Sequence, residues 1–353
     1  MKERHFFVLV AIMLTTCSLQ GMSFVPESSK KSIKAVLEFY PNYAGHLLGV
    51  AQIGYKSQYA EKYLESVKPT DLKYLKDHGD LLRWSDGDEG VLSYFFLTFP
   101  GYINPASKDQ LADYLTDLNS AIAQKSFDTF KNKYEYYIEE LELWTGFNEN
   151  QSLFNYSEEI QTISKILMNN YDSFKEDVWP NETIQIQILA DALNDRLQEW
   201  NLINRWENIT GLKFDSPNYQ VVLSMGMENG PTAKALGYDK DWYFYGDDPR
   251  WLVQNICEEA GFRILSKLCS DQYDNYDPRL CFEVYKTLSN FITDQILADL
   301  NIQHPSSLLK KDTSELYGII DALWTMNSDR DINELYGNAI ETFSKSDFAV
   351  NFE

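Results

Sequence analysis

Histidine, the side chain most often used as a general base or a zinc ligand, is scarce in this chain. Four histidines occur among 353 residues, at His5, His46, His78 and His304. No two of them are three or four residues apart, so none forms the pair on one helical face that binds zinc in a His-Glu-x-x-His site. A Ser or Cys nucleophile would have to recruit its histidine from a distant segment. We therefore expect each histidine to lie at the surface or to cap a helix.

Carboxylates are abundant, with 53 Asp and Glu against 31 Lys and Arg. The segment that starts at Asp329 begins like a calcium-binding loop, but Glu334 and Ile340 stand where that loop needs its glycine and its bidentate glutamate. Solvated loops and helix N-caps are therefore the expected role of the acidic groupings. A pair of carboxylates distant in sequence could still perform glycoside hydrolysis, and no motif marks which two. The groupings lie at residues 86–89, 247–248, 271–277 and 329–333.

The four cysteines suggest different roles. Cys17 lies at the N-terminus and is discussed below. Cys269 and Cys281 flank a polar stretch that we expect to be a loop between two helices, where a disulfide would clamp it; free thiols are the alternative. Cys257 and Cys269 would be about 18 Å apart on one continuous helix, too far to pair, so Cys257 is expected to be a small buried core residue.

The first 23 residues are typical of an export signal. Lys2 and Arg4 precede an apolar run over residues 6–14, which is much shorter than the roughly 20 residues needed to cross a bilayer. The residues before Cys17 form a loose lipobox, which predicts lipidation of this cysteine; ordinary cleavage after Gly21 or Ser23 is the alternative. The mature chain is thus expected in the periplasm, outside the cell, or lipid-anchored at the cell envelope, with no transmembrane span.

Composition and charge exclude several classes of protein. The formal net charge of −22 argues against nucleic-acid binding, which requires Lys and Arg to contact phosphates. A hydrophobic content of 44% is too high for a disordered acidic chain. The sequence contains neither a Gly-x-Ser-x-Gly elbow nor a Gly-rich phosphate loop. The charge is spread along the chain, which is typical of a solvated surface.

Hydrophobic periodicity predicts a mainly helical region over residues 30–210, followed by a small sheet and further helices over residues 211–353. The longest predicted helix is Glu182–Trp206, with Ile184 and Ile188 in its core-facing stripe, after a break at Trp179-Pro180. No Pro-, Gly- or Ser-rich linker separates the regions, so one continuous globular unit is expected. The fold class is α+β, predominantly α-helical.

In the second region, Tyr219–Ser224 and Asp241–Gly246 are β-branched or aromatic and predict strands, with a glycine-containing segment over residues 225–240 between them. Helices are predicted at Arg250–Leu268 and Pro278–Leu300. This order of two strands and two helices resembles the core of zincin metallopeptidases, specifically of gluzincin-like families of exported bacterial proteins. The resemblance covers residues 35 to 300 and is one of pattern, without a specific motif.

In those families the first helix carries His-Glu-x-x-His, and a glutamate on the next helix completes the zinc ligands. Here Glu258 matches the general base and Glu283 the third ligand, but Cys257 and Gly261 replace the two histidines. The resemblance therefore implies a protein without zinc or other cofactor and without peptidase activity, which retains a groove for a peptide or protein partner. The alternatives are a non-enzymatic helical surface or periplasmic lipoprotein, and a carboxylate-dependent hydrolase acting on sugars.

Overall fold

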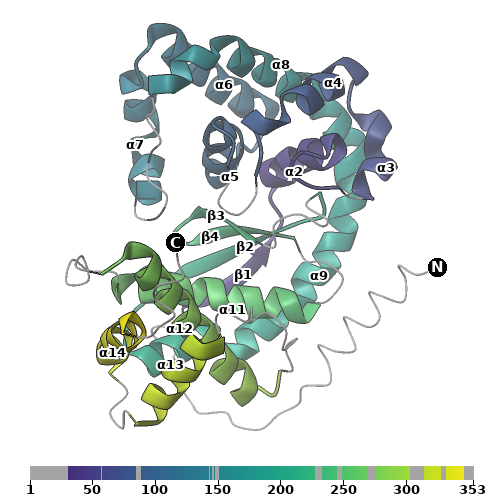
Figure 1. Ribbon diagram of the computed structural model, residues 1–353. Coiled ribbons are helices and arrows are strands. Elements are labelled where there is room, and N and C mark those ends of the chain that lie inside the picture. The colour runs from purple at the N-terminus through teal and green to yellow at the C-terminus, as the bar shows by residue number, and fades with distance from the viewer. Residues whose placement is uncertain are drawn as a thin grey trace. The chain divides into compact units, whose positions relative to one another are not determined.

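The computed structural model confirms the predicted fold class, since it is mostly helical with a small mixed sheet (Figure 1). Contacts within the chain divide it into two units that interleave along the sequence. Unit 1 comprises Met1–Lys34, Asn194–Tyr219 and Asp248–Glu353, and unit 2 comprises Ala35–Leu193 and Gln220–Asp247. The residues that the structure describes are 31–56, 58–84, 89–142, 144, 147, 151–226, 233–244, 249–268, 276–302, 314–326 and 331–345.

Most of the predicted helical region belongs to unit 2. Ring–ring and aliphatic contacts join its helices into one core, in which Phe95, Phe99, Tyr114 and Phe130 pack against one another. The helical elements in chain order are α2 (Phe39–Ala51), α3 (Tyr59–Tyr63), η2 (Leu64–Ser66), α4 (Pro69–Asp77), η3 (Gly79–Leu81), η4 (Tyr94–Thr98), α5 (Phe99–Ile103), α6 (Lys108–Gln124), α7 (Asp128–Glu142), η5 (Gln151–Tyr156), α8 (Ser157–Ser173), η6 (Phe174–Val178) and α9 (Trp179–Trp200), which ends in unit 1.

The sheet has the strand order β1-β2-β4-β3. Strands β2 (Asn218–Ser224) and β4 (Lys240–Phe244) are the two predicted strands, and they pair in parallel. Strand β3 (Ala233–Gly237) pairs antiparallel with β4 and lies in the segment between the two predicted strands, where no strand was predicted. Strand β1 (Ser32–Val36) was also missed.

Helix α2 packs closely against the sheet because glycines stand at the contact, where a side chain would not fit. A Cβ atom on Gly45 would lie 2.7 Å from the Trp242 ring, and one on Gly226 would lie 2.6 Å from the Gly45 carbonyl carbon. Trp84 stacks on Trp242 with ring centroids 4.5 Å apart. The side chain of Asn42 donates to the Leu223 carbonyl at 3.0 Å, which ties the helix to the end of β2.

Two π-helical turns precede an aromatic–proline pair. The turn η4 ends at Thr98, directly before Phe99-Pro100, and η6 ends at Val178, directly before Trp179-Pro180. In each, the N–H of the aromatic residue bonds to the carbonyl five residues earlier. The predicted break at Trp179-Pro180 is therefore wrong: the chain continues from α8 into α9 through a wider turn, which accommodates a proline that lacks its N–H.

The predicted helix Glu182–Trp206 is divided at Asn201, which adopts a left-handed conformation with φ 51°. Asparagine tolerates this conformation better than most residues do, so α9 ends there and α10 (Leu202–Thr210) begins. The stripe assignment was also partly wrong. Ile184 and Ile188 are 65% and 57% exposed, whereas Ile186 on the opposite face is fully buried.

The helices of unit 1 pack mainly on one another, with α12 in contact with four of them. Asp277 and Asp331 cap the N-termini of α12 and α14, accepting from the N–H groups of Arg279 and Asn333 at 2.8 and 2.9 Å. Among the described helices of either unit, none combines the length and apolar character that a membrane crossing requires. The bounds are α11 (Pro249–Leu265), η7 (Ser266–Leu268), α12 (Pro278–Asp299), α13 (Ser314–Met326) and α14 (Ile332–Ser344).

Candidate functional site

The helix pair predicted to carry a degenerate zinc site is present as α11 and α12, which pack on each other. The strands β2 and β4 lie largely in unit 2 and this helix pair in unit 1, so the zincin resemblance stays a prediction. The packing inside unit 1 nevertheless shows where the four motif residues Cys257, Glu258, Gly261 and Glu283 stand.

Cys257 and Gly261, the positions of the two zinc histidines, both face Trp206 of α10. A Cβ atom on Gly261 would lie 2.6 Å from Cη2 of this indole and closer still to its Cζ2, so no side chain fits at position 261. The indole Nε1 donates to the Cys257 carbonyl at 2.9 Å. Because ligands on this face would have to occupy the volume of the indole, the face serves helix packing instead.

The Cys257 thiol is also unsuited to hold a metal. It is fully buried, and burial raises its pKa to about 12. Zinc binds the thiolate, which this environment disfavours. Among the described residues, no group of three or more His, Cys, Asp or Glu side chains is arranged to hold a metal ion.

Glu258 points away from Trp206 toward α12. With its amide nitrogen turned to this carboxyl group, Asn290 donates to both oxygens, at 3.1 Å for Oε2, and Ser289 Oγ donates to the Glu258 backbone carbonyl at 3.2 Å. Burial, followed by the nearby Glu259, raises the pKa of Glu258 to about 8, and the charge of Lys286 offsets this only in part. A carboxyl group with this pKa is protonated for most of the time at neutral pH.

Glu283 does not converge with Glu258. It is half-buried on α12, seven residues before Asn290, which corresponds to roughly 10 Å along the helix axis. The adjacent Phe282 is 57% exposed, while Tyr285 stacks on Phe262 of α11. Glu283 therefore lies two turns of α12 away from Asn290, the residue that Glu258 contacts.

The remaining cysteine predictions fall on residues outside those described. Cys17 and Cys269 are not among the described residues, so lipidation and the disulfide between Cys269 and Cys281 stay predictions. Cys281 lies in the first turn of α12, and its carbonyl accepts a hydrogen bond from the Tyr336 hydroxyl at 3.1 Å.

The expectation for the histidines is wrong for His46. This side chain is 1% exposed in the core of unit 2, where the Tyr59 hydroxyl lies 2.9 Å from Nδ1 and Ser66 Oγ lies 3.0 Å from Nε2. Its apolar surroundings lower its pKa to about 3. His78 fits the expectation, since it is exposed at the end of α4 with Nδ1 3.1 Å from the Tyr74 carbonyl. His304 lies outside the described residues.

The contact between Ser66 and His46 is not a nucleophile–base pair. The Ser66 hydroxyl donates its proton to the Tyr63 carbonyl at 2.6 Å, so His46 Nε2 donates to Ser66 and Nδ1 accepts from Tyr59. A general base needs the opposite arrangement, with the hydroxyl donating to the imidazole. Sequence reasoning missed this network because residues 46, 59 and 66 have no motif spacing.

A buried carboxylate that the sequence did not mark lies in the same unit. Glu182 is 2% exposed and accepts from the Tyr63 hydroxyl and, at 2.8 Å, from Lys62 Nζ. Both donors bond to Oε1, and Oε2 has no hydrogen-bond partner among the described residues. An acidic residue in the first turn of a helix is ordinary in sequence, so its burial could not be inferred.

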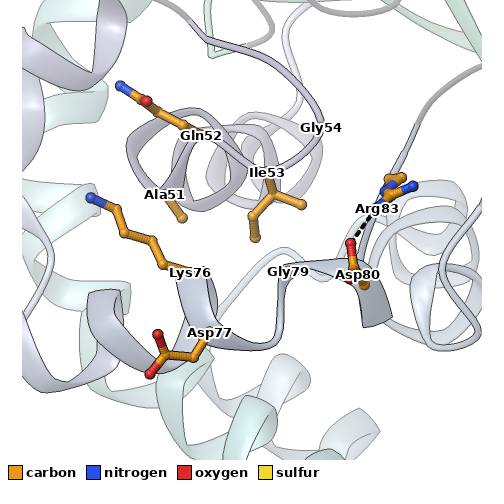
Figure 2. Close-up of a pocket in the computed structure, with 9 residues that line it drawn as sticks. All are labelled: Ala51, Gln52, Ile53, Gly54, Lys76, Asp77, Gly79, Asp80 and Arg83. Atoms are coloured by element: carbon orange, nitrogen blue, oxygen red, sulfur yellow. Dashed lines mark hydrogen bonds and ion pairs between the residues drawn. The ribbon is translucent and has the colours of Figure 1, made fainter.

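A surface pocket of about 430 Å³ opens where the C-terminal ends of α2 and α4 meet (Figure 2). Its carboxylates are exposed and paired with cations, Asp80 with Arg83 and Asp77 with Lys73. A hydrolase that uses two carboxylates needs them to face each other across a protected cleft, which this pocket does not provide. The lining residues are Ala51, Gln52, Ile53, Gly54, Lys76, Asp77, Gly79, Asp80 and Arg83.

Comparison of the chain with protein-family models, with curated proteins and with solved structures finds no match.

Replacing Gly261 tests the packing of Trp206. The G261A substitution is expected to lower the free energy of unfolding by about 1–3 kcal/mol, because the new methyl group overlaps the indole. The matched control is G318A in α13, an exposed position where a Cβ atom meets nothing within 4 Å. That change should raise the free energy by about 0.5–1 kcal/mol. Chemical denaturation measures both, and equal effects of the two substitutions would contradict the packing.

The pH dependence of stability tests Glu258. Its pKa is higher in the folded chain than in the unfolded chain, so the native state holds an extra proton between pH 4.5 and about 8. The extra proton stabilises the native state, so the free energy of unfolding of the wild type should fall as pH rises through this range, by up to about 1.4 kcal/mol per pH unit. The E258Q variant should therefore gain stability relative to wild type between pH 6 and pH 9, measured by urea denaturation.

The matched control for this pH series is E283Q, which removes a carboxylate from the same helix pair. If the difference in free energy of unfolding between E258Q and wild type stays constant with pH, Glu258 is not a buried acid.

Proposed function

We propose that this protein is exported and catalytically inactive as a peptidase, and that it uses a zincin-like scaffold to bind a peptide or protein partner. The observation that carries this proposal is the packing of Trp206 on Cys257 and Gly261. An active zinc peptidase needs three protein ligands and an open coordination position for water. In this chain the corresponding helix face is filled by an indole.

Other arrangements in the described residues support an inactive protein equally. His46 donates to Ser66 instead of accepting its proton, and the acids of the surface pocket are neutralised by ion pairs. Glu258 has the raised pKa of a general acid, but its carboxyl group bonds to Asn290 in the interface of α11 with α12. Each of these groups satisfies a structural need of the fold.

A binding role is supported by large apolar or aromatic side chains that remain exposed on helices of both units. Isolated exposed residues need no explanation, but neighbouring pairs on one helix are typical of interaction surfaces. Such pairs occur on α7 and α9 of unit 2, and single residues on η2 of unit 2 and on α12 and α13 of unit 1. The residues are Leu64, Tyr136, Tyr137, Ile184, Ile188, Phe282 and Met326.

Metal analysis tests the absence of catalysis. We expect the purified protein to contain no stoichiometric zinc after incubation with zinc and gel filtration, and to leave a quenched fluorescent casein substrate intact. The C257H/G261H double variant should unfold at lower temperature and still hold no zinc, because the indole blocks both positions. Stoichiometric zinc together with peptidase activity that is lost in E258Q would overturn the proposal.

Export and lipidation form a separate prediction. The full chain produced in a bacterial host should be found in the cell envelope and should incorporate labelled palmitate, whereas C17S should be exported without the label. If the wild type is exported and unlabelled, cleavage after Gly21 or Ser23 replaces the lipoprotein interpretation. Recovery of the chain in the cytoplasm with an intact N-terminus would contradict export.

A further inference from the structure

One face of unit 2 carries tyrosines beside carboxylates. Tyr136 and Tyr137 of α7 are 67% and 37% exposed, with ring centroids 5.4 Å apart. Tyr137 contacts the ring of Tyr102 edge-on at 6.4 Å. Asp239 and Glu140 lie close enough for their charges to raise the pKa of Tyr102, after the larger effect of burial. We call these five residues the tyrosine–acid patch.

The patch is held in place from beneath. A Cβ atom on Gly237 would lie 2.5 Å from Cε2 of Tyr102, so this ring rests directly on the backbone of β3. Lys240 Nζ donates to the Tyr102 carbonyl at 3.0 Å and lies 5.7 Å from the centre of its ring. The Tyr102 ring is thus positioned before any partner binds, which reduces the conformational entropy that binding would cost.

Helix α7 is itself anchored in the core. Tyr134, at the point where the helix is kinked, is buried against Phe130 with ring centroids 4.7 Å apart, and its hydroxyl donates to Asp117 at 2.9 Å. Tyr136 and Tyr137 follow on the outer side of the next turn. The exposed rings therefore extend from a helix whose neighbouring residues Tyr134 and Ile138 are buried in the core.

The charge of the patch is negative. Residues 134–142 of α7 contain Glu135, Glu139, Glu140 and Glu142 and neither Lys nor Arg. The cation beneath the patch, Lys240, is buried and its charge is balanced by Glu38 at 2.6 Å. Tyrosine rings and carboxylates both attract cations, the rings through their negative faces.

We propose that the tyrosine–acid patch binds a basic polypeptide segment, with arginine or lysine side chains over the rings of Tyr136 and Tyr137 and paired with Glu140. This proposal rests on the binding role proposed above and gives it a partner chemistry. Arginine suits the site better than lysine, because its planar guanidinium stacks on a ring while it bonds to a carboxylate. The net charge of −22 favours the approach of such a partner.

The experiment uses a fluorescein-labelled peptide of alternating Arg and Gly, with binding measured by fluorescence anisotropy. The wild-type chain should bind it, and Y136A/Y137A should weaken binding about tenfold through loss of the cation–π contacts. E140Q should weaken binding and reduce its dependence on salt. These positions are exposed or half-buried, and circular dichroism checks that the variants fold as the wild type does.

Two controls distinguish a specific site from general attraction to an acidic protein. E315Q removes the same charge from an exposed position on α13 and should leave binding unchanged. A peptide with citrulline in place of arginine keeps the shape without the charge and should not bind. Equal weakening by E315Q and by Y136A/Y137A, or equal binding of the citrulline peptide, would overturn the proposal.

A third outcome would also overturn the proposal. In it, the wild-type chain does not bind the arginine peptide but binds an uncharged oligosaccharide such as cellohexaose, and Y136A/Y137A loses this binding. In that case the aromatic face serves sugar stacking instead. The zinc and casein measurements do not depend on this patch, so a failure here is distinguishable from a failure of the proposed lack of catalysis.

Discussion

The indole of Trp206 determines what α11 can do. It occupies the volume beside Gly261 and bonds to the carbonyl of Cys257. Helices α10 and α11 can cross here because residue 261 has no side chain and because the Cys257 carbonyl, one turn earlier, accepts the indole N–H. With this face committed to packing, Glu258 on the neighbouring face of the helix is directed into the interface with α12. The polar contacts with Asn290 and Ser289 follow from that orientation.

Sequence patterns predicted elements with a clear compositional signal or start signal well, and elements without one poorly. Helices α11 and α12 and strands β2 and β4 were found within a few residues of their observed ends. Strands β1 and β3 have five residues each, and alanine, lysine and glycine in β3 give it no β-strand signal. They form because β2 and β4 offer hydrogen-bonding edges, which is a property of the tertiary structure.

The candidate site shows a different limit of sequence reasoning. The spacing of Cys257 and Gly261 placed both residues on one helical face, and both meet Trp206 in the structure. Spacing could not show that a tryptophan more than fifty residues earlier covers that face. The same limit explains His46, whose burial depends on Tyr59 and Ser66, and Ile184, whose apolar character suggested a core that lies on the opposite face of α9.

The π-helical turn before Trp179 sets the rotational phase of the helix that follows it. A turn closed over five residues contains one residue more than an α-helical turn, and one residue corresponds to about 100° around the helix axis. The inward positions of Glu182 and Ile186 therefore depend on that added residue. Deletion of a single residue between Phe174 and Val178 would leave every side chain of α9 unchanged and yet turn a different side of the helix toward the core. The number of residues in this turn therefore constrains the protein as strictly as residue identity does.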